Sequence, residues 1–319
     1  MQQDILTTTK KVVENSKSVS IRKEGVQKFC NSFSSNDSAT TELGDTAQFD
    51  ISQRIGLVCI FNCVNFCFWA PKGKEKWATN VGGEMVDGAN GIFRALEKAL
   101  KNDVPLLDAH FLKTLDREEL SEILNGNVEI PLLNERVRCL NEAGEVLLGN
   151  FDGSFMNVLM RAHNDAVELV NIFSRFFPSF NDYAVFEGTK IEFYKRAQLN
   201  ADMINHRLVR GGEKKLSNLD KLTAFADYKV PQMLRKFGIL EYTSELSEAI
   251  DSYEEISAGS REEIEIRAST VWAIEQIKEM LLFRFPQITA RQLDEHLWSL
   301  GQIKSPDNKP YHRTKTIFY

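Results

Sequence analysis

The sequence predicts a mainly α-helical protein with a small β element in its first third. Apolar side chains recur at helical spacing through most of the chain after residue 90, which is the pattern of helices that bury one face. The exception is a continuous apolar and aromatic run at 56–70, followed by a turn-rich stretch at 71–88. These two observations favour helices as the framework and confine the strands to a short region.

The first third of the chain divides into a helix, a linker and the expected β element. We expect a helix over 8–34 and a loop or linker over 35–50, where small polar residues dominate. Residues 56–70, GLVCIFNCVNFCFWA, are too few to span a membrane, and they predict a buried strand or a strand that leads into a helix. Glycines, a proline and charged residues at 71–88 predict a short hairpin.

The later helices are recognised by periodicity and by end signals. Asp116 has the position of an N-cap, Gly126 lies near the end of the same helix, and Gly301 is expected to close the last helix. We expect a loop with short extended pieces over 178–192 and a basic loop over 211–218. The predicted helices cover residues 91–102, 116–127, 132–148, 154–177, 193–209, 260–285 and 289–301, and a further one begins within 223–234.

Composition argues against several classes of function. The net charge of −6 does not attract polyanions, which argues against a nucleic-acid-binding protein. No run of about 20 apolar residues predicts a membrane span, and the N-terminus lacks the apolar centre of a signal peptide. An odd number of cysteines, five, indicates reduced thiols. We therefore expect a cytoplasmic protein without a membrane partner.

Three cysteines, Cys59, Cys63 and Cys67, recur every four residues within the apolar run. This spacing resembles a metal-binding stripe, but no histidine or acid lies nearby, and buried structural thiols are the favoured interpretation. The five histidines are scattered, and no glycine-rich phosphate loop, HExxH or GxSxG motif is present. Carboxylates beside aromatic residues remain as the possible chemistry, since they suit a heteroaromatic base and a developing positive charge.

The stretch TAFADYKVPQML at 223–234 has this combination. Asp227 lies between Phe225 and Tyr228, and Pro231 falls in the first turn of the helix that follows. The acid has the position of a helix cap, and it also has the setting of a catalytic carboxylate. The residues alone leave both roles open.

Four longer motifs give the chain a resemblance to a known family. The motifs NFCFW (65–69), FYKRAQLNAD (193–202), FADYKVPQML (225–234) and EIRASTVWAIE (265–275), with their spacing, closely resemble the queuosine salvage protein family. The resemblance extends over residues 10–319. It implies a single domain over 1–319, with a helical region and linker at 1–50 and a catalytic core at 51–319. It also implies a helical fold that resembles the helix-hairpin-helix DNA glycosylases.

The activity that this resemblance implies is hydrolysis of the N-glycosidic bond of queuosine 5′-phosphate, which releases the base queuine. The expected partner is therefore a small-molecule substrate, without stable nucleic acid, and no metal or organic cofactor is implied. A glycosylase that acts on nucleic acid and a non-catalytic nucleobase-binding protein are the alternatives. The sequence does not determine an oligomeric state.

Site residues follow from the resemblance position by position. Asp227 is expected to be the catalytic carboxylate beside the sugar, Phe225 to stack on the deazapurine ring, and Asp294 to contact the base. Trp298, one helical turn after Asp294, is expected to brace it or to wall the pocket. Core packing is the alternative for both Phe225 and Trp298.

A basic pair, Lys195 and Arg196, is the expected contact for the 5′-phosphate, with a solvated helix face as the alternative. Asp202 lies seven residues after Lys195 and hence on the same face of the predicted helix. The segment YHR at 311–313 is a second phosphate candidate.

Four departures from the family pattern concern the rest of the substrate. This chain has Asn62 where relatives often have Asp, and TTELGD at 40–45 lacks a family histidine. Glu295 and Ser299 replace a tyrosine and an acid of some relatives, so both are candidate contacts to the aminomethyl-cyclopentenediol arm of queuine. Glu295 is suited to meet the secondary ammonium of that arm.

Overall fold

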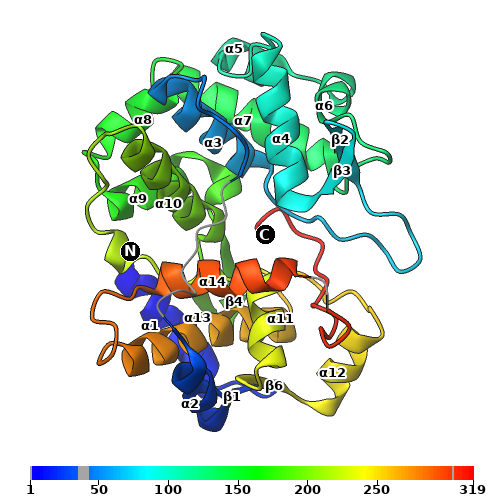
Figure 1. The fold of residues 1–319 in the computed structure, drawn as a ribbon, viewed down its shortest axis with the longest axis vertical. Coiled ribbons are helices and arrows are strands. Elements are labelled where there is room, and N and C mark those ends of the chain that lie inside the picture. Colours follow the sequence, from blue (N-terminus) through cyan, green and yellow to red (C-terminus); the bar gives the residue numbers. More distant parts are fainter. Residues whose placement is uncertain (1, 35–42, 304) are drawn as a thin grey trace. The chain divides into compact units, whose positions relative to one another are not determined.

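The computed structural model describes residues 2–34, 43–303 and 305–319, and within them the chain forms two compact units (Figure 1). Each unit combines segments that are distant in sequence. Unit 1 consists of Met1–Thr41, Asp182–Lys195 and Asp220–Thr316; unit 2 consists of Glu42–Asn181, Arg196–Leu219 and Ile317–Tyr319. Both are mainly helical with small antiparallel strand pairs, as the sequence predicts. A single domain over 1–319 stays a prediction.

Unit 1 is organised around one long helix, α13 (Arg261–Leu281), which contacts four other helices of the unit. Those helices are α1 (Gln2–Glu14), α2 (Lys23–Ser32), α11 (Lys229–Lys236) and α14 (Ala290–Gln302); α12 (Ser244–Asp251) packs near β6. The antiparallel strand pairs of the unit are β1 (Val19–Ile21) with β6 (Leu240–Tyr242), and β4 (Tyr183–Phe186) with β5 (Thr189–Glu192). Figure 1 shows α13 in orange beside α1, α11 and α14.

Apolar side chains from these elements form two clusters in unit 1. The larger cluster joins α2, α11, α13 and α14 and includes Phe29, Leu234, Ile274 and Leu297. The smaller one joins α1 and the β4–β5 hairpin to α13, and it includes Ala226, the residue before Asp227. Burial of this much apolar surface is the main term that holds the helices together.

Unit 2 is a set of helices with one hairpin. Its strands β2 (Ala78–Val81) and β3 (Glu84–Asp87) confirm the hairpin expected within 71–88. The helices are α3 (Ile51–Val64), α4 (Gly88–Lys101), α5 (Ala109–Thr114), α6 (Arg117–Leu124), α7 (Leu133–Asn150), α8 (Phe155–Arg161) and α9 (Ala166–Phe176), then the short 3₁₀ turn Pro178–Phe180 and α10 (Lys195–Arg210), whose first residue belongs to unit 1. Rings of Phe151, Phe173, Phe177 and Phe180 pack on one another, which explains part of the high phenylalanine content.

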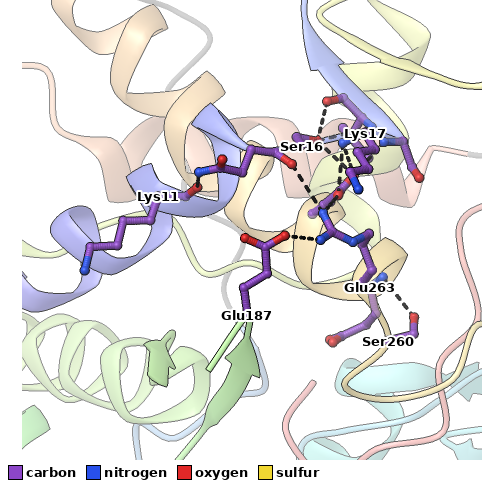
Figure 2. A network of polar contacts seen from close by, with 11 residues as sticks. Lys11, Ser16, Lys17, Glu187, Ser260 and Glu263 are labelled. Atoms are coloured by element: carbon purple, nitrogen blue, oxygen red, sulfur yellow. Dashed lines mark hydrogen bonds and ion pairs between the residues drawn. The ribbon is translucent and has the colours of Figure 1, made fainter. Parts of the chain in front are cut away.

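The predicted helix over 8–34 is wrong in its middle. The chain leaves α1 at Glu14, turns, and enters β1. The turn is held by Glu265 of α13, whose carboxylate accepts the Lys17 N–H at 3.0 Å, the Ser18 N–H at 2.6 Å and the Ser16 hydroxyl at 2.8 Å. Figure 2 shows Ser16 and Lys17 within this network. A partner about 250 positions away competes with the helix for these groups, so local periodicity misses the break.

The run 56–70 is mostly helix, so the expectation of a strand is wrong. Asp50 and Gln53 form a capping box at the start of α3, which then runs to Val64. The helix is buried on all sides from Ile55 to Val64, and a helix without a polar face has no visible period of 3.6. The capping-box residues Asp50 and Gln53 were the feature of the sequence that could have predicted this helix. Part of the linker, 35–42, lies outside the described residues, as does the start of the TTELGD stretch.

Two other helix predictions need correction. The segment 154–177 is split into α8 and α9, because His163 and Asn164 adopt positive φ values of 52° and 56° and Asp165 caps a new helix. Gly301 lies inside α14 and does not end it. A Cβ there would lie 3.5 Å from Met233 and 3.6 Å from Lys229, which are ordinary contact distances, so the packing of α11 on α14 does not require this glycine.

Candidate functional site

Asp227 lies two residues before the first residue of α11, and its side chain holds the start of that helix. Oδ1 accepts the backbone N–H of Lys229 at 2.8 Å and that of Val230 at 2.9 Å. These are two of the donors that a helix leaves without partners at its first turn, so the expected capping interaction is confirmed. Neither bond uses Oδ2. The cap therefore fixes the carboxyl group while one oxygen remains for other chemistry.

Burial and charge act on Asp227 in opposite directions. The residue is only 6% exposed, and burial raises the pKa of its carboxyl group above the ordinary value. The positive charge of Lys195, the two cap hydrogen bonds and the charge of Lys229 lower that pKa in part. A carboxylate in this setting is poorly hydrated, and its electric field is therefore strong.

Lys195 is the first residue of α10 and belongs to the same unit as Asp227. It is 7% exposed, and its charge is the largest influence that favours the ionised form of Asp227. A buried cation beside a buried carboxylate is the arrangement in which each stabilises the charge of the other. The structure thus brings together two residues that are 32 positions apart in the sequence.

Asp294 and Phe225 are joined directly. Oδ2 of Asp294, on α14, accepts the backbone N–H of Phe225 at 2.9 Å, and both residues are buried. The bond ties α14 to the segment that carries Asp227, two residues further on. A carboxylate has room for about four hydrogen bonds, so Asp294 can hold Phe225 and still accept from a ligand.

The other candidates on α14 are less buried than Asp294. Glu295, Trp298 and Ser299 are each partly exposed, and Trp298 packs against the larger apolar cluster of unit 1. Trp298 therefore contributes to core packing, which was the alternative expected for it. Glu295 and Ser299 lie one turn apart on the helix and share a face beside that of Asp294 and Trp298.

Arg196 has a different environment from its neighbour Lys195. Its guanidinium lies in unit 2, 1% exposed, and donates to the carbonyl oxygens of Asn62 at 2.7 Å, Cys63 at 2.9 Å and Ser179. Asn62 and Cys63 lie in the last turn of α3, where carbonyl groups lack helical partners. Arg196 thus stabilises the C-terminus of α3.

Asp202 also belongs to unit 2. It is 3% exposed and lies 3.9 Å from Nε2 of His206, one turn along α10. Of the candidates, unit 1 contains Lys195, Phe225, Asp227, Asp294, Glu295, Trp298 and Ser299, and unit 2 contains Arg196 and Asp202.

Two buried charged residues of unit 1 escaped prediction. Asp182 and Arg267 form an ion pair and contact the segments of Lys195 and Asp227. Arg267 lies within the family motif EIRASTVWAIE, so the sequence could have marked it as a candidate. Asp182, in NDYAVF, lies in none of the four long motifs, so the sequence offered no such indication.

Comparison with known proteins identifies the family. The family model described as queuosine salvage protein matches residues 47–319, which include every candidate residue. The chain belongs to the queuosine salvage protein family.

Three curated relatives of this chain carry the name queuosine 5′-phosphate N-glycosylase/hydrolase. One, from Sphaerobacter thermophilus, is 38% identical over 99% of this chain and 97% of the relative. The mouse protein is 32% identical over 83% of this chain and 82% of its own length. The protein from Dictyostelium discoideum is 30% identical over 82% of this chain and 77% of its own length. The family resemblance of the sequence is therefore confirmed.

The cysteines of the chain lie in its interior. All five lie among the described residues, are buried and form no disulfide. Burial raises the pKa of Cys59 to about 12 and that of Cys63 well above the ordinary value. The prediction that these thiols are buried is therefore confirmed.

Asn62 is fully buried. Its amide donates to the carbonyl of Val58 at 3.0 Å and to Oδ1 of Asn200 at 3.2 Å, and its Oδ1 accepts from Asn65 at 3.4 Å. A neutral amide satisfies these partners without a buried charge.

Among the described residues, no helix combines the length and apolar character that a bilayer crossing requires.

Proposed function

We propose that this protein hydrolyses the N-glycosidic bond of queuosine 5′-phosphate and releases queuine for salvage into tRNA modification. The observation that carries the proposal is the buried Asp227, fixed by a helix start and set beside Lys195 in one unit with Phe225 and Asp294. The names of the relatives support the same substrate.

Asp227 supplies the catalytic carboxylate. Cleavage of a ribose–base bond develops positive charge on the sugar, as an oxocarbenium ion. Oδ2 of Asp227 faces that charge and stabilises it, and the same oxygen orients or deprotonates the attacking water. The cap bonds hold the carboxylate in place during the reaction, so little reorganisation is needed. Queuine lacks the N7 that can be protonated in ordinary purines, so the departure of the base depends more on the carboxylate that stabilises the charge of the sugar.

Recognition of the base falls to Phe225 and to α14. The ring of Phe225 stacks on the deazapurine, and Asp294 accepts from the N1–H and the exocyclic amine of the guanine-like edge. Glu295 and Ser299 contact the arm of the base, with Glu295 facing its ammonium group, and Trp298 walls the pocket. The bond from Phe225 to Asp294 supports this arrangement, because it couples the stacking residue to the polar one.

The 5′-phosphate is held by Lys195. The contacts of Arg196 with three main-chain carbonyls favour a structural role for it, although the two residues are adjacent. Asp202 of unit 2 stays a prediction of the family resemblance. No metal or organic cofactor takes part, and the protein acts in the cytoplasm without stable nucleic acid. The helical core follows the arrangement of the helix-hairpin-helix glycosylases.

The test is release of free base. The protein is incubated with queuosine 5′-phosphate, with the nucleoside and with a queuosine-containing oligonucleotide, and queuine is quantified by chromatography and mass spectrometry. We expect release mainly from the monophosphate, with and without a chelator. Release mainly from the oligonucleotide would support a nucleic-acid glycosylase, and binding without release would support a nucleobase-binding protein. Loss of activity in chelator would overturn the metal-free mechanism.

A further inference from the structure

Behind the candidate site of unit 1 lies a buried ion pair. Nη1 of Arg267 is 3.0 Å from Oδ1 of Asp182, and Nη2 is 2.6 Å from Oδ2, a two-pronged pairing with both side chains 2% exposed. Asp182 precedes β4, and Arg267 lies in the second turn of α13. A buried pair of this kind stabilises a fold weakly compared with apolar residues, so its presence suggests another purpose.

Asp182 determines where α10 begins. Its Oδ2 accepts the backbone N–H of Lys195 at 3.1 Å, and its main-chain oxygen accepts those of Phe193 at 3.1 Å and Tyr194 at 3.2 Å. Tyr194 has a positive φ of 48°, a conformation that non-glycine residues adopt only where their surroundings impose it. Three hydrogen bonds to one residue thus direct the turn that delivers Lys195 to the site.

Arg267 reaches the segment of the catalytic carboxylate. Its Nε is 3.3 Å from the carbonyl oxygen of Ala226, the residue before Asp227, and its guanidinium lies 3.9 Å from the ring centre of Phe193. One guanidinium therefore contacts both chain segments, through Asp182 and Phe193 on the Lys195 side and through Ala226 on the Asp227 side.

The helix that carries Arg267 is itself anchored. Oε1 of Glu263, one turn earlier, is 3.5 Å from Nη1 of Arg267, and the Glu263 N–H is capped by Ser260 at 3.2 Å. Arg261 donates to Glu187 of the β4–β5 hairpin and to Glu265, which also holds the turn after α1. Figure 2 shows Glu187, Ser260 and Glu263 in this network. The first turns of α13 therefore have a fixed position relative to the hairpin.

We propose that Asp182 and Arg267 are positioning residues that hold Lys195 and Asp227 at their working separation. The proposal rests on the function proposed above. The planar fork of arginine can pair with a carboxylate through two nitrogens and donate to a carbonyl through the third, whereas lysine has one nitrogen. A displacement of about 1 Å at a reacting group can reduce the rate about 100-fold.

The charges around Asp227 make the proposal testable. The cations that act on it are Lys195 from α10 and Lys229 from α11, while Arg267 of α13 is matched by Asp182 and Glu263. Arg267→Lys keeps the net charge and removes the fork. The positive charge of Lys195 lowers the pKa of Asp227. If Lys195 moves away in the variant, this lowering becomes weaker, so the pKa of Asp227 and its titration midpoint rise.

The experiment compares Arg267→Lys with Arg136→Lys. Arg136 is also fully buried, but it donates to the carbonyls of Val64, Phe66 and Cys67 in unit 2. Release of queuine gives kcat/KM, and ¹³C NMR gives the titration midpoint of the Asp227 carboxyl, assigned with Asp227→Asn. We expect Arg267→Lys to lower kcat/KM about 10- to 100-fold and to raise the midpoint. We expect Arg136→Lys to lower the melting temperature while kcat/KM stays within about 3-fold and the midpoint is unchanged.

A wild-type midpoint in folded Arg267→Lys would overturn the proposal. If Arg267→Lys does not fold, Asp182→Glu is measured in the same way, since it keeps the charges and shifts the carboxylate. The NMR titration needs no substrate. A wild-type protein that fails to cleave queuosine 5′-phosphate would therefore refute the proposed function, while the midpoints still decide whether Arg267 positions Asp227.

Discussion

Buried arginines serve the two units in different ways. In unit 1, Arg267 pairs with Asp182, near Glu263, and touches the chain next to Asp227. In unit 2, Arg136 and Arg196 donate to main-chain carbonyls at the end of α3 and stack near the ring of Phe66. The first arrangement joins charged side chains of distant segments, and the second satisfies the end of one helix.

The difference shows that burial of a cation does not by itself mark a binding site. Lys195 and Arg196 are neighbours and both are buried, yet one influences the charge of Asp227 and the other binds carbonyl oxygens. The two residues differ in their partners. Lys195 acts on a carboxylate, which can gain or lose a proton, whereas Arg196 binds carbonyl groups, which do not titrate. The following predictions test this contrast, beginning with the largest effect.

Removal of the catalytic charge should have the largest effect on turnover. Asp227→Asn keeps the size of the side chain and can still accept the N–H groups of Lys229 and Val230, so the fold persists. We expect kcat to fall by at least about 100-fold, the scale for loss of one preorganised electrostatic group. Single-turnover release of queuine, with circular dichroism as the control for folding, measures this. Near-normal turnover would remove Asp227 from the mechanism.

Lys195→Gln should weaken the preference for a phosphorylated substrate. We expect the ratio of kcat/KM for the 5′-phosphate to that for the nucleoside to fall about 10- to 30-fold, because one charge-assisted contact is lost. The ratio cancels any effect of Lys195 on Asp227 that both substrates share. An unchanged ratio would place the phosphate elsewhere.

Arg196→Lys is the matched change on the other side of the contrast. We expect the free energy of unfolding to fall by about 2–4 kcal/mol, since hydrogen bonds from a buried cation to the carbonyls of α3 are lost. The preference for the phosphorylated substrate should stay at the wild-type value. Denaturant melts and the same kinetic ratio decide this, and a large loss of preference would return Arg196 to the phosphate site.

The smallest expected effect concerns stability and pH. The pKa of Asp227 is raised in the folded protein, so between its unfolded and folded pKa values the folded state binds more protons and stability falls as pH rises. Asp227→Asn lacks this penalty. We expect its melting temperature to exceed that of the wild type by a few degrees at pH 8, and the difference to vanish near pH 4. A difference that is equal at both pH values would contradict the raised pKa.

Local signals in the sequence predicted much of the fold. The helix α6 begins at the capping box of Asp116, α11 begins beside Asp227, and the hairpin β2–β3 lies in its turn-rich stretch. Prediction failed where long-range partners decide. The turn after α1 depends on Glu265, and α3 is concealed by burial on every face.

The sequence by itself determined the family, through four long motifs, and the identity of the carboxylate at the start of α11. It also offered the capping role of Asp227, which the structure confirms, because a cap needs only groups that lie within three residues. Only the tertiary structure separated Lys195 from Arg196 and joined Asp182 to Arg267 across 85 positions of sequence. The physical reason is that the effect of a buried charge depends on the partners that folding brings within a few ångströms, and adjacent residues on a helix face different partners.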